Sequence, residues 1–138
     1  MMRPTVLGLA LVLLPLCAPA WAQAEKESAK AAAEPVVKQL EAFRRDDYDT
    51  AYTFASEEIR SRFDRMGFEV MVRRGYPEIA NSVFAAVTRT ELQPDGAVHV
   101  TIKIRGANGQ SVEALYELVW QGAWRINGVL TRPDAGVI

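Results

Sequence analysis

Residues 98–120, VHVTIKIRGANGQSVEALYELVW, decide the fold of this chain. Every second residue is apolar in each half, and a loop that contains Gly and Asn separates the halves, which is typical of a β-hairpin. When the two apolar faces coincide, Lys103 lies opposite Glu113 and His99 lies opposite Glu117. The side chains expected on the inner face are Val98, Val100, Ile102, Ile104, Val112, Ala114, Tyr116, Leu118 and Trp120.

The turn after Trp120 is predicted by the same comparison of faces. A two-residue loop would place Trp124 opposite Val119, on the outer face of the sheet. A three-residue loop places Trp124 opposite Trp120 and Ile126 opposite Leu118, so that apolar side chains share the inner face. We therefore expect a three-residue loop.

A four-stranded antiparallel sheet follows from the turns within residues 82–130. Residues 93–96 and 106–110 contain the Gly, Pro, Asn and Asp that favour turns. Strands are expected at 82–92, 98–105, 112–120 and 124–130. The first run is apolar on both faces, and the sequence does not decide its register.

The chain before the sheet is predicted to be helical. Pro35 suits the first turn of a helix, and Val36, Leu40 and Phe43 continue one apolar stripe behind it. We expect this helix to begin at Pro35.

The segment RRDDYDTAYTF, residues 44–54, contains three aspartates, which we interpret as a joint between two helices rather than an acid/base cluster. Asp49 is expected to cap the second helix and to contribute about 1 kcal/mol. Ser56 is expected to cap a third helix over 57–64, which Gly67 would end.

The first 22 residues have the pattern of a secretory signal peptide. A basic start at Arg3 and an apolar run over 6–16 precede small residues, and cleavage is expected between Ala22 and Gln23. A cut two residues later, after Ala24, fits the small-residue rule nearly as well. The apolar run is too short to span a membrane. We expect an exported protein, periplasmic or secreted, with no membrane span in its mature form.

The mature chain would consist of an exposed helical lead-in at 23–34, one α+β domain at 35–131 and a tail at 132–138. Cleavage would remove Cys17, the only cysteine, and Arg3, which moves the net charge from −1 to about −2. A disulfide is then excluded, and nothing in the charge balance indicates nucleic-acid binding.

Helices followed by an antiparallel meander predict an α+β cone, in which N-terminal helices pack on a curved four-stranded antiparallel sheet. The joint at 43–54 resembles that of the nuclear-transport-factor-2-like (cystatin-like) superfamily. With Met71-Val72-Arg73-Arg74-Gly75-Tyr76-Pro77 and Trp124-Arg125-Ile126 added, residues 34–131 resemble a bacterial exported family called domain of unknown function 4864. That resemblance implies a fold without an activity.

Relatives of this cone include ketosteroid-isomerase-like and polyketide-cyclase-like enzymes. The resemblance implies an aspartate or histidine acid/base inside the cone, helped by a tyrosine or a second acid. The inner faces predicted for the last three strands carry no carboxylate, and His99 falls on the outer face. No spacing of His, Asp or Glu predicts a metal site, and we expect no cofactor.

Aromatic residues are the remaining candidates for a site, because they either line an apolar pocket or fill the core. The candidates are Tyr52, Tyr76, Tyr116, Trp120 and Trp124. We expect a noncatalytic module that binds a small apolar ligand or a protein partner. The alternatives are an acid/base enzyme of the two kinds above, or a structural homodimer that pairs through an outer sheet face carrying Leu115, Val119 and Val129.

Overall fold

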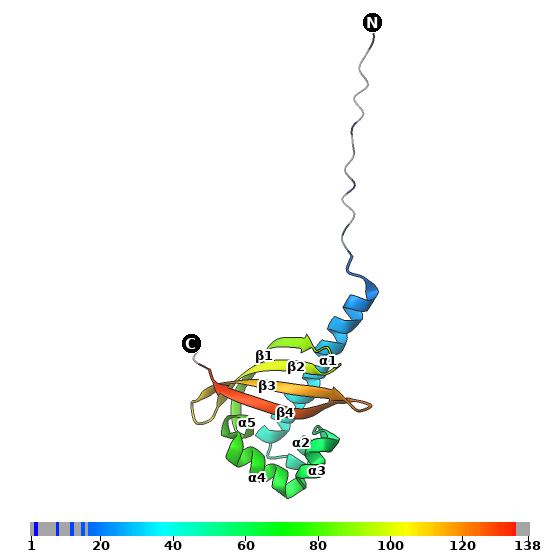
Figure 1. Cartoon of the computed structure of the whole chain (residues 1–138). Coiled ribbons are helices and arrows are strands. Elements are labelled where there is room, and N and C mark those ends of the chain that lie inside the picture. Colours follow the sequence, from blue (N-terminus) through cyan, green and yellow to red (C-terminus); the bar gives the residue numbers. More distant parts are fainter. Residues whose placement is uncertain (1, 3–7, 9–11, 13–14, 16, 135–138) are drawn as a thin grey trace.

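The computed structural model describes residues 2, 8, 12, 15 and 17–134. Helices come first and one antiparallel sheet follows, in the strand order β1-β2-β3-β4 (Figure 1). The predicted α+β class, with helices on a curved four-stranded antiparallel sheet, is confirmed. The elements are α1 (Ala20–Arg44), α2 (Tyr48–Thr53), α3 (Glu57–Arg62), α4 (Arg65–Gly75), α5 (Pro77–Ala80), β1 (Ser82–Leu92), β2 (Val98–Gly106), β3 (Ser111–Trp120) and β4 (Trp124–Pro133).

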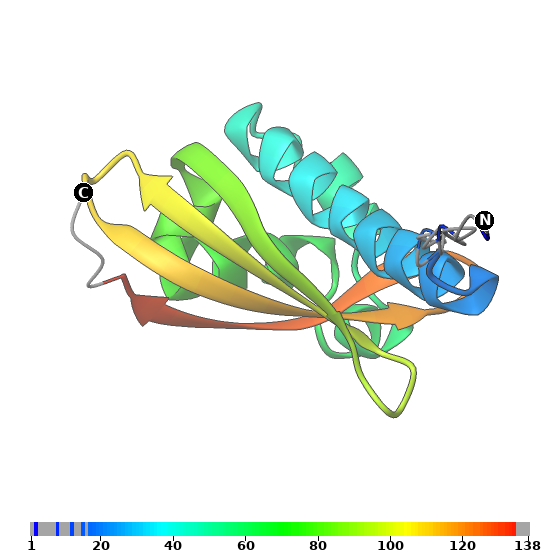
Figure 2. The ribbon, with the colours of Figure 1, turned by 90° about the horizontal axis from the view of Figure 1, so that it is seen from above.

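The helices cover one face of the sheet and leave the other face open. Helix α1 runs diagonally across the sheet beside β1 (Figure 2), while α2 to α5 gather below β4 in the view of Figure 1. The inner faces of β2 and β3 are buried against these helices, as their alternating pattern predicts. The core therefore lies between the sheet and the helices.

The predicted pairing of β2, β3 and β4 is confirmed at its decisive positions. Lys103 faces Glu113 and His99 faces Glu117 across β2 and β3. Trp120 faces Trp124 across a three-residue loop, which the Gln121 N–H closes by donating to the Ala123 carbonyl at 2.9 Å.

Asn127 is an extra residue in β4 and forms a β-bulge. Leu118 faces Ile126 but Glu117 faces Gly128, so Asn127 has no counterpart on β3. Beyond the bulge the alternation of faces is offset by one residue. The prediction of Val129 on the outer face is therefore wrong, because Val129 faces Tyr116 on the inner side and the next residue, Leu130, lies outside and is exposed.

Side chains from two other elements hold the bulge in place. The Ser56 hydroxyl donates to Asn127 Oδ1 at 2.8 Å, and Asn127 Nδ2 donates to Glu117 Oε1 at 2.8 Å. Both the oxygen and the nitrogen of the Asn127 side-chain amide therefore have hydrogen-bond partners, as polar groups removed from water need.

The helical lead-in expected at 23–34 continues without a break into the helix expected from Pro35, and the two form α1, which begins at Ala20. The separate start predicted at Pro35 is therefore wrong. The expected exposure of residues 23–34 is also wrong in part, because Ala29, Ala32 and Ala33 are buried. Their small side chains let the helix lie close to its neighbours, and Pro35 removes only one N–H donor from the helix. Arg3, most of the apolar run at 6–16, and residues 135–138 lie outside the described residues.

One of the two predicted caps of the short helices differs in the structure. Asp47, not Asp49, caps α2 by accepting from the Thr50 N–H at 3.1 Å. Asp49 instead binds Arg65 Nε at 2.6 Å. Ser56 caps α3 as predicted, with the Ile59 N–H at 3.2 Å from its hydroxyl.

The prediction that Gly67 ends a helix is wrong. Gly67 lies in the first turn of α4, where its N–H donates to the Asp64 carboxylate at 2.7 Å. Asp64 is therefore an N-cap, and the chain turns into α4 rather than stopping there.

Candidate functional site

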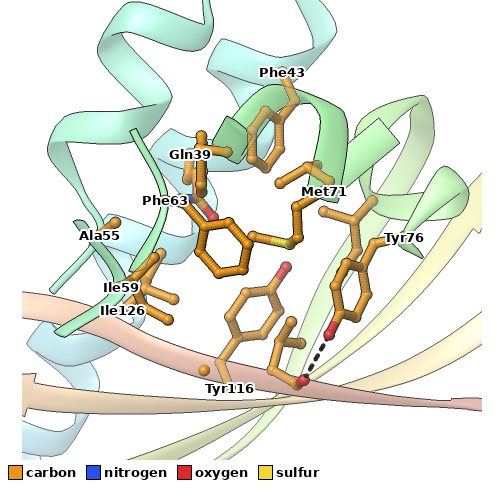
Figure 3. Close-up of a pocket in the computed structure, with 14 residues that line it drawn as sticks. Gln39, Phe43, Ala55, Ile59, Phe63, Met71, Tyr76, Tyr116 and Ile126 are labelled. Carbon is orange, nitrogen blue, oxygen red and sulfur yellow. Dashed lines mark hydrogen bonds between the residues drawn. The ribbon is translucent and has the colours of Figure 1, made fainter. Parts of the chain in front are cut away.

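A cavity of about 200 Å³ lies between the helices and the inner face of β3 and β4 (Figure 3). Nearly all of its lining is aliphatic, aromatic or thioether, and every helix except α2 contributes to it. This is the usual character of a small-molecule site. The lining residues are Gln39, Phe43, Ala55, Ile59, Phe63, Phe68, Met71, Val72, Tyr76, Ile79, Tyr116, Ile126, Gly128 and Val129.

Tyr116 is the polar group at the sheet side of the cavity. Only 1% of its surface is exposed, and its hydroxyl has no hydrogen-bond partner among the described residues. In Figure 3 this hydroxyl points away from the sheet, into the space bounded by Phe63, Met71 and Tyr76. Burial raises the pKa of the Tyr116 phenol well above its ordinary value, so the hydroxyl keeps its proton.

The other polar side chains of the lining already have partners. Gln39 Nε2 donates to the Ala51 carbonyl at 3.1 Å, and the Tyr76 hydroxyl donates to the Val129 carbonyl at 3.4 Å. No Asp, Glu, His, Lys or Arg is among the described residues that line the cavity. The described lining residues therefore carry no charge, and among them only Tyr116 has a buried side-chain polar atom without a hydrogen-bond partner.

Strand β4 and the segment after α2 pair at one side of the cavity. The Ile126 N–H donates to the Phe54 carbonyl at 2.8 Å, and the Ser56 N–H donates to the Ile126 carbonyl at 2.8 Å. These bonds fix the start of α3 against the sheet and bring Ala55 and Ile126 together in the lining.

Tyr52 holds the other end of α3 from outside the cavity. Its hydroxyl donates to the Phe63 carbonyl at 2.6 Å, and its ring lies 5.3 Å from that of Phe68. Tyr52 therefore positions Phe63, which lines the cavity, without lining it itself.

The five aromatic residues predicted as pocket candidates are not all brought together. Tyr76 and Tyr116 line the cavity, whereas Tyr52, Trp120 and Trp124 do not. Trp120 is 63% exposed at the end of β3, beside the loop of the β3–β4 hairpin. Trp124 packs edge-on against Trp120, with ring centroids 5.4 Å apart.

The sequence reasoning did not name the lining residues that come from the helices, chiefly Phe63, Phe68, Met71 and Val72. Phe68, Met71 and Val72 lie at helical spacing in the sequence, which indicates a short helix with one apolar face. That signal identifies a buried face, but it does not reveal that a space remains beneath it.

The helix joint, residues 44–54, contains a second buried tyrosine with an unpartnered hydroxyl. Tyr48 is 1% exposed and does not line the cavity. The guanidinium carbon of Arg73 lies 4.5 Å from its ring centroid and that of Arg65 lies 5.5 Å away, within the range of cation–π attraction. Burial raises the pKa of Tyr48, and the charge of Arg73 opposes that rise.

Arg65 and Arg73, the two α4 arginines that lie over the ring of Tyr48, are neutralised by carboxylates. Glu69 lies 3.0 Å from each, Asp46 binds Arg73 at 3.2 Å, and Asp49 binds Arg65. Bonds to both arginines lower the pKa of Glu69 below its ordinary value. The joint is thus a closed set of ion pairs over an aromatic ring, which supports its interpretation as a structural connection.

The outer sheet face carries charged pairs around two leucines. His99 lies 3.8 Å from Glu117, and Glu113 pairs with Arg132 rather than with Lys103, which it faces. Leu115 and Leu130 face each other there and are exposed.

Neither a metal cluster nor a membrane span is found in the described part of the chain. No group of three or more His, Cys, Asp or Glu side chains lies close enough to hold a metal ion there. Over the same residues, none of the helices has the length and apolar character needed to cross a membrane.

Comparison with protein-family models places most of the chain in one family. The model of the family described as "Domain of unknown function (DUF4864)" matches residues 25–137. Searches of curated proteins and of solved structures find no match to the chain.

Proposed function

The chain belongs to the DUF4864 family, and we propose that it is a noncatalytic module that binds a small, mainly apolar molecule in the cavity beneath α3 and α4. The observation that carries this proposal is a preformed cavity of about 200 Å³ with an apolar lining. A cavity of about 150 Å³ lined by similar side chains is large enough to bind benzene. The ligand would therefore be of about single-ring size.

An acid/base enzyme is supported less well by the same cavity. An isomerase or cyclase of this kind needs a carboxylate or a histidine within reach of the reacting atom. The described lining residues include neither, and His99 lies on the outer face beside Glu117. Tyr116 could polarise a bound oxygen, but the lining offers no base to take up a proton.

Export and superfamily membership belong to the same proposal. The signal-peptide pattern of residues 1–22 supports a periplasmic or secreted protein, and N-terminal sequencing of the mature protein should begin at Gln23, or at Glu25 if the cut falls after Ala24. The order of helices and curved sheet supports membership of the nuclear-transport-factor-2-like superfamily.

A homodimer through the outer sheet face is the second candidate. The exposed Leu115 and Leu130 pair across β3 and β4 and form an apolar centre with charges around it. A sedimentation profile that remains monomeric at high protein concentration would argue against it.

The binding proposal can be tested with toluene as the probe and two neighbouring substitutions. Val129 lines the cavity and Leu130 lies on the opposite face, so Val129→Phe should fill the cavity while Leu130→Phe should not. Titration followed by two-dimensional NMR should show toluene binding to the unchanged protein and to Leu130→Phe, and none to Val129→Phe.

Shifts around Tyr116 and Met71 would place the probe in the cavity. Absence of binding to the unchanged protein would overturn the proposal, as would binding that Val129→Phe does not reduce. Circular dichroism of both variants should show that each remains folded.

A further inference from the structure

The unpartnered hydroxyl of Tyr116 indicates the chemistry of the ligand. A buried polar group without a partner is uncommon in folded proteins, because leaving it unpaired is unfavourable. Here the group is aimed into the cavity rather than packed against the core (Figure 3). A molecule in the cavity is therefore in a position to supply the missing partner.

We propose that the ligand is a neutral molecule of about one ring that bears a single hydrogen-bond acceptor, such as a carbonyl oxygen, bonded to the Tyr116 hydroxyl. This inference rests on the proposed function, because it concerns the same cavity. It adds the polarity and the charge of the ligand to its size.

The neutrality of the ligand follows from the lining. Moving a carboxylate or an ammonium group into an apolar site is unfavourable unless a partner of opposite charge is present. The described lining residues offer no charged side chain. One phenol hydroxyl is too little to replace the water around an ion, so charged analogues are disfavoured.

The choice of an acceptor follows from the hydroxyl itself. The Tyr76 hydroxyl and the Gln39 amide already donate to the Val129 and Ala51 carbonyls. The Tyr116 hydroxyl donates to nothing in the described residues, and it remains protonated. Its O–H is therefore the donor that a ligand oxygen would meet.

The single-ring size and the ring shape follow from the surrounding walls. Phe63, Met71 and Tyr76 surround the Tyr116 hydroxyl in Figure 3, and they present flat or flexible apolar surfaces. Rings pack well on such surfaces, and thioethers adapt to them. A ring bearing one carbonyl group would bury its apolar part against these walls and direct its oxygen toward the hydroxyl.

Four probes of similar shape separate these requirements: ethylbenzene, acetophenone, benzoate and benzylamine. Ethylbenzene and acetophenone differ in the carbonyl oxygen, while benzoate is anionic and benzylamine is cationic at neutral pH. Isothermal titration or NMR titration of the full chain should give the order acetophenone, then ethylbenzene, with both ions binding much more weakly.

Tyr116→Phe tests the contact directly, with Tyr76→Phe as the matched control. Removing the Tyr116 hydroxyl should weaken acetophenone binding by roughly fivefold, the usual value of one neutral hydrogen bond, and leave ethylbenzene unchanged. Tyr76→Phe should leave the ratio between the two ligands unchanged, because the Tyr76 hydroxyl already has a protein acceptor.

Two kinds of failure can be told apart. If neither ethylbenzene nor acetophenone binds the unchanged protein, the proposed function itself is overturned. If ethylbenzene binds but Tyr116→Phe leaves the acetophenone affinity unchanged, or if benzoate binds as tightly as acetophenone, the binding function stands and this inference is overturned.

Discussion

The helix joint and the cavity each contain a fully buried tyrosine whose hydroxyl has no partner among the described residues, yet their surroundings differ. At the joint, the ring of Tyr48 lies beneath two guanidinium groups that carboxylates neutralise. In the cavity, Tyr116 faces apolar walls and an open volume. An unpartnered hydroxyl therefore does not identify a binding site by itself, and the space in front of it does.

The largest effect expected from this comparison concerns the ring of Tyr48. Tyr48→Ala should lower the free energy of unfolding by about 3 to 5 kcal/mol, because it removes a large buried side chain and the surface on which the arginines rest. Urea unfolding would measure the loss. The half-buried Tyr76, substituted in the same way, is the control and should lose less. Equal losses of unfolding free energy would show that Tyr48 stabilises the protein no more than Tyr76 does.

The stability of the protein should fall at alkaline pH because Tyr116 is buried in its protonated form. Burial raises its pKa in the folded protein above the unfolded value of about 10, so the folded state keeps its proton while the unfolded state loses it. Stability should therefore fall above pH 10, by about 1.4 kcal/mol per pH unit from this residue. Tyr116→Phe should make the fall shallower.

The measurement is urea unfolding of both proteins at several pH values between 8 and about 11. The two proteins should have the same pH dependence below pH 9, where the tyrosine is protonated in both states. Identical slopes above pH 10 would mean that Tyr116 ionises in the folded protein as easily as in the unfolded one.

The smallest effects concern the two aspartates that sequence reasoning confused. Asp47→Ala should destabilise the protein by about 1 kcal/mol, because it removes the cap of α2. Asp49→Ala should cost about 0.3 kcal/mol, because its side chain is largely exposed and only pairs with Arg65 at the surface. Thermal unfolding of the two variants would compare them, and the reverse order would restore Asp49 as the cap.

The sheet was the most predictable part of this protein. Alternation in β2 and β3 is strict, and the charged pairs on the outer face agree with only one alignment, so the register followed from residues such as Lys103 and Glu113. The loop after Trp120 could be chosen for the same reason. The first strand was not predictable, because β1 contains two irregularities in its pairing with β2.

The errors lie where tertiary contacts override a local preference. Pro35 is a favourable helix start, but the buried Ala29, Ala32 and Ala33 extend α1 beyond it. Asp47 and Asp49 are equally good caps by residue type, and the positive φ of 55° at Asp46 sets where the chain turns into α2.

The cavity could be predicted only in part. Tyr116 was named from its position on the inward face of a strand and Tyr76 only as an aromatic residue, and both line the cavity. Trp120 shares the face of Tyr116 by alternation, but it is exposed and does not line the cavity. Periodicity reports which face of an element is buried, whereas a cavity depends on how closely two elements approach.

The bulge at Asn127 also matters for sequence comparison within the family. In a related chain that lacks the extra residue, the residue equivalent to each position after 127 stands one place earlier in the sequence. An alignment of β4 without a one-residue gap here would equate Val129, which lines the cavity, with an outward residue of the relative. Columns after position 127 should therefore be compared by face before they are compared by residue type.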